Sequence, residues 1–169
     1  MVKRTLRKTN TTVLIVVEGE TEEAFAAHLK RLYYQRGMPL SVSIKNAHGY
    51  GPQGMIDKIK SVAQTADFDR RFAVLDTDIA LLPAQEKWLR AQKIGLIFST
   101  PAIDATLLSI LGKKAPAVTA ACKSELQKQA PGEPTDGRYY EKYFPLATLE
   151  AARPKNPALE ALIAALSKV

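Results

Sequence analysis

The chain has 169 residues, 46% hydrophobic and 24% charged, which is the composition of a folded globular protein rather than a disordered one. No apolar run approaches the length of a membrane span, and polar Thr9 and Asn10 follow the basic amino terminus where a signal peptide would be apolar. A single cysteine, Cys122, and two histidines exclude an internal disulfide and a structural zinc site. We therefore expect a cytoplasmic protein with no membrane partner. Its formal net charge of +7 favours a polyanion, nucleic acid above all.

Apolar patterning predicts strands and helices in alternation. Strands are expected at 12–17, 40–46, 72–75 and 94–98. Helices are expected from Thr21, as N-cap, to a stop at Gly37, from Pro52 to 63, and at 81–92, 103–111, 118–128 and 138–144, with a last one capped by Asn156. This alternation predicts an α/β fold with a mainly parallel sheet. We divide the chain into a basic arm (1–11), an α/β domain (12–129) and a loop and helical extension (130–169) packing on the same domain.

Carboxylates follow two of the expected strands. They are Glu18 and Glu22, after the apolar run 13–17, and Asp76 and Asp78, after the apolar run 72–75. The carboxyl ends of parallel strands form the edge of a sheet at which ligands bind. Like charges gathered there repel one another and usually need a hard cation. An all-oxygen ligand set predicts Mg²⁺ or Mn²⁺ and phosphoryl chemistry.

Each of these acids also has a structural interpretation. Glu22 and its neighbour Glu23 stand at the expected start of a helix, where the helix dipole favours negative charge. Asp76 can be an ordinary loop residue after a strand, although the second carboxylate two positions on makes this less attractive. If the strand continues, Asp76 and Asp78 share a face, and if it ends at Asp76 they flank a turn. Either geometry lets both approach one ion.

The acidic motifs resemble those of the Toprim domain, the catalytic module of type IA and type II topoisomerases, bacterial primases, recombination-repair proteins and the OLD nucleases. Residues 17–22, Val-Glu-Gly-Glu-Thr-Glu, are most similar to the OLD and RloB-like branches, and residues 76–78 supply an Asp-x-Asp motif. Residues 99–108, Ser-Thr-Pro-Ala-Ile-Asp-Ala-Thr-Leu-Leu, are similar to the RloB-like stretch Ser-Asn-Pro-x-Phe-Glu-x-Trp-Leu-Leu, with Asp104 in place of its glutamate. The resemblance covers residues 12–112.

This resemblance implies a Toprim-type, Rossmann-like three-layer fold with a mainly parallel four-stranded sheet flanked by helices. It implies that Asp76 and Asp78 bind Mg²⁺, and that Glu18 is a ligand or the general acid/base. Glu22 and Asp104 would complete the shell of a second ion, if there is one. Since the chain has no room for the domain that carries a topoisomerase's nucleophilic tyrosine, water is the expected nucleophile, as in the OLD nucleases. A role in phage defence or nucleic-acid processing follows from the resemblance alone.

Further residues near the same edge are candidates for substrate contact. They are Gly19, within the Glu-Gly motif, His48, and Lys113 or Lys114, which follow the helix after the fourth strand. Solvated lysines are the plain alternative for the last two. Residues 49–54, Gly-Tyr-Gly-Pro-Gln-Gly, match the dinucleotide motif G-x-G-x-x-G. Because Pro52 has no N–H to offer a pyrophosphate, a strand-to-helix loop is the better interpretation, in which His48 and Tyr50 face substrate or only fill the loop.

Two classes of function stay open. The first is a Mg²⁺-dependent Toprim-type nuclease that hydrolyses DNA or RNA. The second is a non-cleaving Toprim-like module that binds a nucleic acid or phosphorylated ligand as subunit of an ATPase complex. OLD-type and RloB-like systems pair a Toprim module with an ATPase in this way. A small-molecule phosphotransfer or phosphatase site would use the same acids. The sequence leaves open the strandedness of the substrate, the number of metals, a homodimer, and whether the aromatic residues at 139–144 stack on bases or pack in the core.

Overall fold

The computed structural model describes residues 10–168, so residues 1–9 of the predicted basic arm lie outside the described part. The strands are β1 (Thr11–Val17), β2 (Leu40–Asn46), β3 (Arg70–Asp76) and β4 (Gly95–Ser99). The helices are α1 (Glu20–Tyr33), α2 (Gly51–Ala63), α3 (Pro83–Ala91), α4 (Ile103–Ile110), α5 (Thr119–Gln129), α6 (Gly137–Tyr143), α7 (Leu146–Ala152) and α8 (Pro157–Ser167), with a 3-10 helix η1 (Arg153–Lys155) before the last. Within residues 10–168, no helix has the length and apolar character needed to cross a bilayer.

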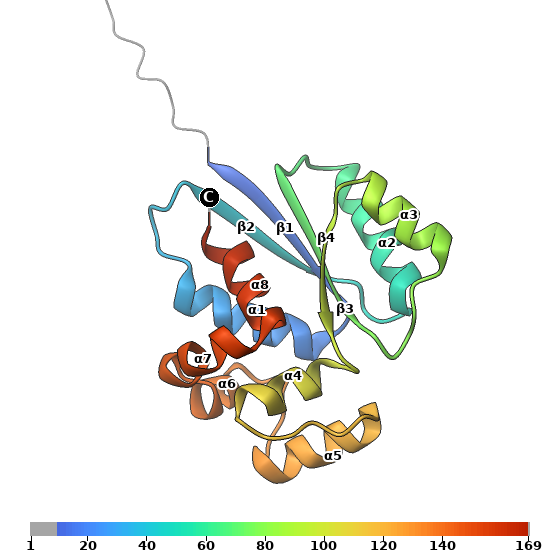
Figure 1. Cartoon of the computed structure of the whole chain (residues 1–169). Coiled ribbons are helices and arrows are strands. Elements are labelled where there is room, and N and C mark those ends of the chain that lie inside the picture. Colours follow the sequence, from blue (N-terminus) through green and yellow to red (C-terminus); the bar gives the residue numbers. More distant parts are fainter. Residues whose placement is uncertain (1–9, 169) are drawn as a thin grey trace, which may run out of the picture.

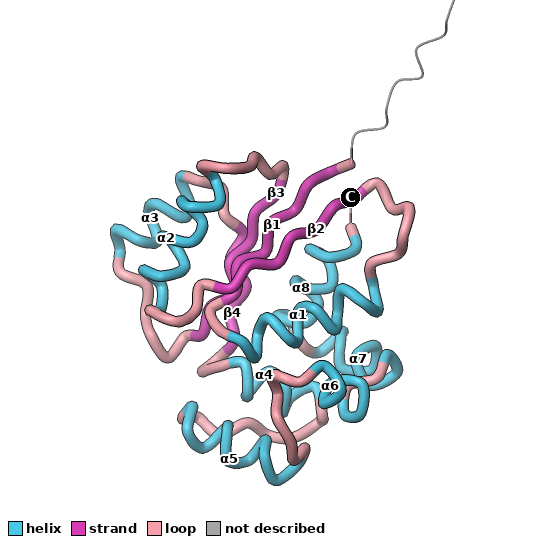
Figure 2. Tube along the Cα trace, turned by 180° about the vertical axis from the view of Figure 1, so that it is seen from behind, coloured by secondary structure: helices cyan, strands magenta, loops and turns pink. Residues whose placement is uncertain are grey.

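The four strands form one all-parallel sheet in the order β2-β1-β3-β4. Helices α2 and α3 cover one face, and α1 and α8 lie on the other (Figures 1 and 2). The chain is therefore a three-layer, Rossmann-like α/β protein, and the predicted fold class is confirmed. Continuous apolar strands suit this arrangement because both faces of a central strand are covered.

Strand β1 shows how one sequence supplies two cores. Its alternate residues Val13, Ile15 and Val17 pack with α1 and the carboxyl-terminal helices, while Leu14 and Val16 pack with α2 and α3. All five of these side chains are at most 1% exposed. Burial on both faces fixes the register of the central strand, because a slip of one residue would exchange its two sets of side chains.

The order of the strands creates a switch point between β1 and β3. These strands are hydrogen-bonded neighbours, yet α1, which follows β1, and α3, which follows β3, lie on opposite faces of the sheet (Figure 1). The connections therefore diverge at the carboxyl ends of the two strands. In open parallel sheets, such a switch point is where ligands bind.

The segment after β4 packs on the face that carries α1. Phe25 of α1, Tyr140 of α6 and Phe144 form an aromatic cluster with ring centroids 5.4–6.2 Å apart, and all three side chains are fully buried. The Tyr140 hydroxyl donates to the backbone carbonyl of Thr21 over 3.1 Å. His28 donates to the carbonyl of Phe144 over 2.8 Å. The aromatic residues at 139–144 are thus mainly core residues, and they fix the start of α1.

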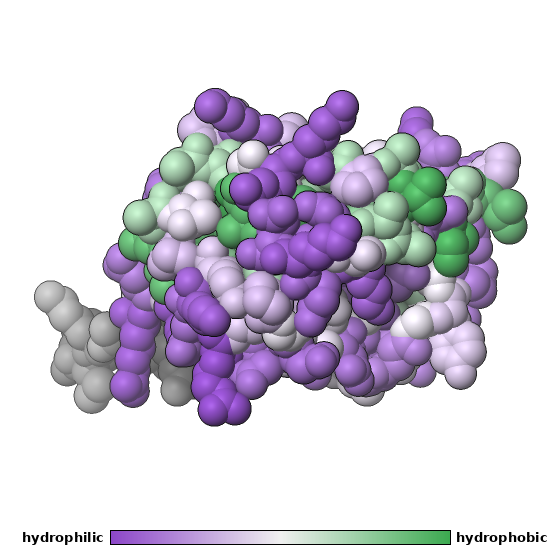
Figure 3. Space-filling model, turned by 90° about the horizontal axis from the view of Figure 1, so that it is seen from below, coloured by the Kyte–Doolittle hydropathy of each residue, from purple (hydrophilic) through white to green (hydrophobic). Residues whose placement is uncertain are grey.

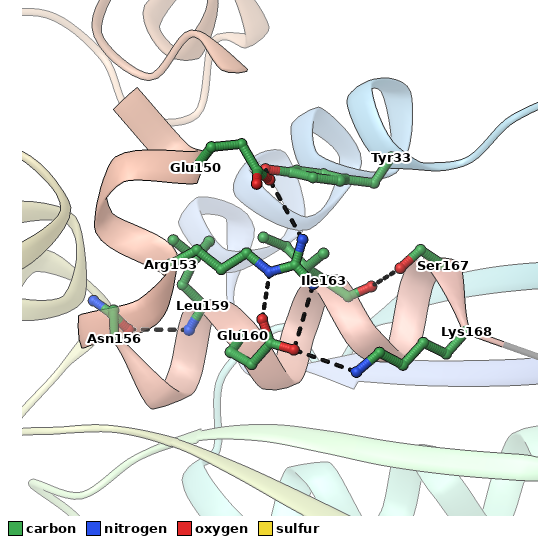
Figure 4. A network of polar contacts seen from close by, with 9 residues as sticks. All are labelled: Tyr33, Glu150, Arg153, Asn156, Leu159, Glu160, Ile163, Ser167 and Lys168. Atoms are coloured by element: carbon green, nitrogen blue, oxygen red, sulfur yellow. Dashed lines mark hydrogen bonds and ion pairs between the residues drawn. The ribbon is translucent and has the colours of Figure 1, made fainter. Parts of the chain in front are cut away.

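A polar network joins the far end of α1 to α7, η1 and α8 (Figure 4). The Tyr33 hydroxyl donates to Glu150 over 2.6 Å, and Arg153 pairs with both Glu150 and Glu160. Asn156 accepts from the N–H of Leu159 over 3.0 Å, so its predicted role as the N-cap of the last helix is confirmed.

Two local predictions were wrong, and one helix was missed. Helix α1 starts at Glu20 with Gly19 as N-cap, rather than at Thr21, and its first turn carries Glu20, Glu22 and Glu23. It ends at Tyr33, before Gly37. Helix α7 was not predicted, because its seven residues bury only one side chain, Leu149, and so show no helical period.

We expect Phe144→Ala to lower the free energy of unfolding by about 3–5 kcal/mol, because a fully buried ring in an aromatic cluster would be replaced by a cavity. Leu146→Ala is the matched control, since Leu146 lies two residues on and is 47% exposed, and it should change stability by less than about 0.5 kcal/mol. Urea unfolding monitored by circular dichroism measures both. Equal effects would contradict the packing of this segment.

Candidate functional site

Glu18 and Asp76 meet at the switch point. Glu18 directly follows β1, and Asp76 is the last residue of β3. Val17 is opposite Val74 in the register, so β3 extends two residues further and brings its end beside Glu18. The backbone N–H of Asp76 faces the Glu18 carboxylate. The strand ends at Asp76, so of the two predicted geometries Asp76 and Asp78 flank a turn.

This turn is held by the loop between β4 and α4. The N–H groups of Thr77 and Asp78 both donate to the carbonyl of Pro101, over 3.0 and 3.1 Å. The Asp78 carboxylate accepts from the Thr119 hydroxyl over 2.9 Å, and the N–H of Ile103 faces the Asp76 carboxylate. The two aspartates are therefore positioned by elements that follow them by 20 residues or more.

Glu22 folds back over the amino end of α1. Its side chain is buried, and its carboxylate faces its own N–H and that of Gly19. A Cβ on Gly19 would lie 3.2 Å from Oε2 of Glu22. The glycine of the Glu-Gly motif thus leaves room for a carboxylate, while its predicted contact with substrate stays a prediction.

Asp104 lies in the first turn of α4, close enough to Glu22 for their charges to interact. It is 9% exposed, and burial raises its pKa, whereas the ammonium group of Lys123 on α5 lowers it. Its charge also raises the pKa of Glu22. The pair Asp104 and Lys123 lines a pocket of about 450 Å³ between α4 and α5.

Electrostatics make Asp76 the most perturbed acid of the group. Burial first, and then the negative charges of Glu22, Glu18 and Asp78, raise the pKa of Asp76 to about 8. Burial is also the main cause that raises the pKa of Glu18 and of Glu22. The Oδ1 atom of Asp76 is buried without a hydrogen-bond partner. A buried acceptor with no donor lowers the stability of the fold, and such groups mark sites where a ligand or ion supplies the missing partner.

The other predicted substrate contacts lie further out. His48 is exposed on the loop after β2, where its N–H donates to the Asn46 side chain over 2.7 Å. Lys113 and Lys114 are exposed beyond the carboxyl end of α4, whereas Asp104 lies in the first turn of that helix. The contacts of these three residues with substrate stay predictions.

Lys123 is a basic residue of the site that the sequence analysis did not select. Its separation from Asp104 by 19 positions gave no local signal, and only the packing of α5 on α4 brings the two together.

The glycine-rich loop supports the same edge of the sheet. The N–H of Gly49 donates to the carbonyl of Glu18 over 2.9 Å. Pro52 lies in the first turn of α2, as predicted. A Cβ on Gly54 would collide with the carbonyl of Gly49, so close packing of the loop on itself accounts for this glycine. The loop therefore has a structural reason for its motif without a dinucleotide.

The acidic residues have the type of ligand atom that a hard cation prefers, but their side chains are not arranged to bind one. Glu18, Asp76 and Asp78 offer only oxygen ligands, and the orphaned Oδ1 of Asp76 is an unused one. Yet no group of three His, Cys, Asp or Glu side chains within residues 10–168 is arranged so that it could hold a metal ion. Binding would require these side chains to turn toward one another.

Comparison with family models, with curated proteins and with solved structures finds no match to this chain. The argument for function therefore comes from the site itself.

We expect the metal-free protein to lose about 1 kcal/mol of stability between pH 6.5 and pH 8.5. The unfolded chain, with an ordinary aspartate pKa of 3.8, has already released the proton that native Asp76 holds until its pKa of about 8. Because the native state binds more protons, its stability falls as pH rises through this window. Below this pH window, the lowered pKa of buried His28 has the opposite effect, so its contribution makes the protein more stable as pH rises.

The Asp76→Asn variant should remove most of this slope and be more stable than the wild type at pH 8.5, by about 1–2 kcal/mol after allowance for water at the partly exposed site. Exposed Asp67→Asn is the control and should keep the wild-type slope. Urea unfolding in EDTA at both pH values measures the difference. A slope unchanged in Asp76→Asn would show that Asp76 is not the perturbed group.

Proposed function

We propose that the protein is a Mg²⁺-dependent nuclease of Toprim type, which hydrolyses phosphodiester bonds of DNA or RNA. The observation that carries this proposal is the uncompensated group of carboxylates, Glu18, Asp76 and Asp78, at the switch point of the sheet. An all-carboxylate site is suited to a polyanionic substrate only with a cation between the two. The net charge of +7 supports a polyanion as substrate.

The chain's own residues have separable roles in this proposal. Asp76 and Asp78 would hold the ion, with Glu18 as a further ligand or as the acid/base group. Glu22 and Asp104 extend the negative field behind them and would serve a second ion. The chemistry that Mg²⁺ supplies when bound is activation of a water molecule and neutralisation of charge on the phosphate oxygens.

Burial also makes Glu18 suited to proton transfer. Its pKa is raised, mainly by burial, so it exchanges a proton nearer to neutral pH than an exposed glutamate does. A carboxyl group of this kind can accept a proton from the nucleophile or return one to the leaving oxygen. The Asp76 N–H, which faces it, keeps it oriented toward the end of β3.

One observation favours the alternative, a non-cleaving Toprim-like module that binds nucleic acid or a phosphorylated ligand as part of an ATPase complex. In the described residues the carboxylates do not converge as a formed metal site. A partner protein or the nucleic acid itself would then have to bring them together. Binding without cleavage by the isolated chain distinguishes this alternative.

Cleavage of labelled DNA and RNA, single- and double-stranded, should require Mg²⁺ or Mn²⁺ and stop in EDTA. Asp76→Asn and Glu18→Gln should each lower the cleavage rate about 100-fold or more, because each removes a charged group that acts on the reacting atoms. Glu20→Gln is the matched control, since Glu20 is an exposed acid at the start of α1, and it should keep the wild-type rate. Wild-type binding of nucleic acid without cleavage would favour the alternative.

Metal binding can be tested apart from activity. At pH 8, Mg²⁺ in the millimolar range should raise the melting temperature of the wild type, because a bound ligand stabilises the folded state. Asp76→Asn should lose this increase, while Glu20→Gln should keep it. An equal increase in all three proteins would place the ion elsewhere.

A further inference from the structure

Beside the carboxylates, on the side of α2 and α3, lies a pocket of about 340 Å³ whose wall includes Asp76 itself. It is formed by residues of α2, of the end of β3 and the loop after it, of α3 and of β4, namely Pro52, Leu75, Asp76, Thr77, Ile79, Ala80, Leu81, Glu86, Leu96 and Phe98. Its size is at the lower end of the range for small-ligand pockets. Strand β4, which lines the pocket, is an outer strand of the sheet.

Exposed apolar side chains gather around this pocket. Ile79 is 53% exposed and Phe98 is 42% exposed, and both line it, while Leu82, 61% exposed, follows on the same loop. Seen from the carboxyl ends of the strands, hydrophobic residues are exposed on the side of α2 and α3 and also on the opposite side, whereas the centre is hydrophilic (Figure 3). Exposed apolar side chains at the wall of a pocket mark a place where an apolar group binds.

Tyr50 lies on the loop that leads to this pocket, and it lines a separate pocket together with residues of α2. It is 88% exposed and has a left-handed backbone conformation, with a φ of 65°, that tyrosine rarely adopts. The next two residues connect it with the pocket, because Pro52 lines the wall and a Cβ on Gly51 would lie 3.4 Å from Ile79. Strain kept in a loop beside a candidate site is typical of a functional element.

The chemistry of the wall selects the part of a ligand that fits. Its polar side chains are the carboxylates of Asp76 and Glu86 and the hydroxyl of Thr77, and none of the described residues that line it is basic. Such a wall repels a phosphate and suits a flat, neutral, mostly apolar group with N–H donors on its edge. A nucleobase is such a group, and within one nucleotide it lies next to the phosphate.

We propose that this pocket holds an unpaired nucleobase next to the phosphate bound at the carboxylates, so that the substrate is single-stranded or has an extruded base. The inference rests on the proposed function for the position of the phosphate. A base in a duplex is stacked and paired, and it cannot enter such a pocket without leaving the helix. Stacking on Phe98 would favour any base over none.

The test measures binding of a short single-stranded oligonucleotide with a central fluorescent 2-aminopurine, in Mg²⁺, to protein that carries Glu18→Gln to prevent cleavage. Adding Phe98→Ala or Ile79→Ala should weaken binding about 10-fold, as expected for loss of one stacking contact. Adding Leu146→Ala, an exposed apolar residue of α7 outside the pocket, should have no effect. A strand with an abasic site in place of the base, measured by competition with the fluorescent strand, should bind Phe98→Ala and its parent equally.

The outcomes separate this inference from the proposed nuclease. Base-dependent binding that is lost in Phe98→Ala supports the pocket, even if the wild type cleaves nothing and the nuclease proposal fails. Equal binding of base-bearing and abasic strands, or no binding at all, overturns the pocket, even if the wild type cleaves. If Phe98→Ala instead changes the sedimentation of the protein and leaves binding intact, the apolar surface is an interface between proteins, and the inference is also overturned.

Discussion

Mutual repulsion of partly buried carboxylates is the constraint around which this edge of the sheet is organised. Glu18 and Asp76 are brought together because β1 and β3 are neighbours in register and both end there. Burial and the neighbouring acids raise the pKa of Asp76 to about 8, and its buried Oδ1 has no donor. A protein selected for stability alone would place a hydrogen-bond donor or an apolar residue at such a position. The unfavourable arrangement is therefore best explained by what binds there.

Packing elsewhere offsets this cost and holds the acids in place. The two cores share β1, so its end, and with it Glu18, is fixed from both faces of the sheet. The carboxyl-terminal helices contribute as well, since Tyr140 binds the backbone of Thr21 and Thr119 binds Asp78. The segment after β4 is thus part of the support of the candidate site, and its aromatic cluster reaches the start of α1.

The surroundings of the acids differ on their two sides. Toward α4 and α5 lie Asp104 and the ammonium group of Lys123, in a pocket with charged side chains in its wall. Toward α2 and α3 lies the apolar pocket with Phe98 in its wall. A nucleotide strand has the same two kinds of surface, a charged backbone and apolar bases. A bound strand would therefore lie across the edge of the sheet with its backbone toward α4 and α5 and its bases toward α2 and α3.

The sequence by itself determined most of the elements and the acidic character of the site. Apolar runs such as 13–17 predict buried strands, and a carboxylate directly after such a run must lie at an edge of the sheet, because strand geometry is local. Only the tertiary structure decided which acids meet and what surrounds them. The strand order, the effect of the Lys123 charge on Asp104, the turn held by Pro101 and the apolar pocket all depend on residues far apart in the chain. Such contacts arise from the packing of layers, and no local pattern of residues encodes them.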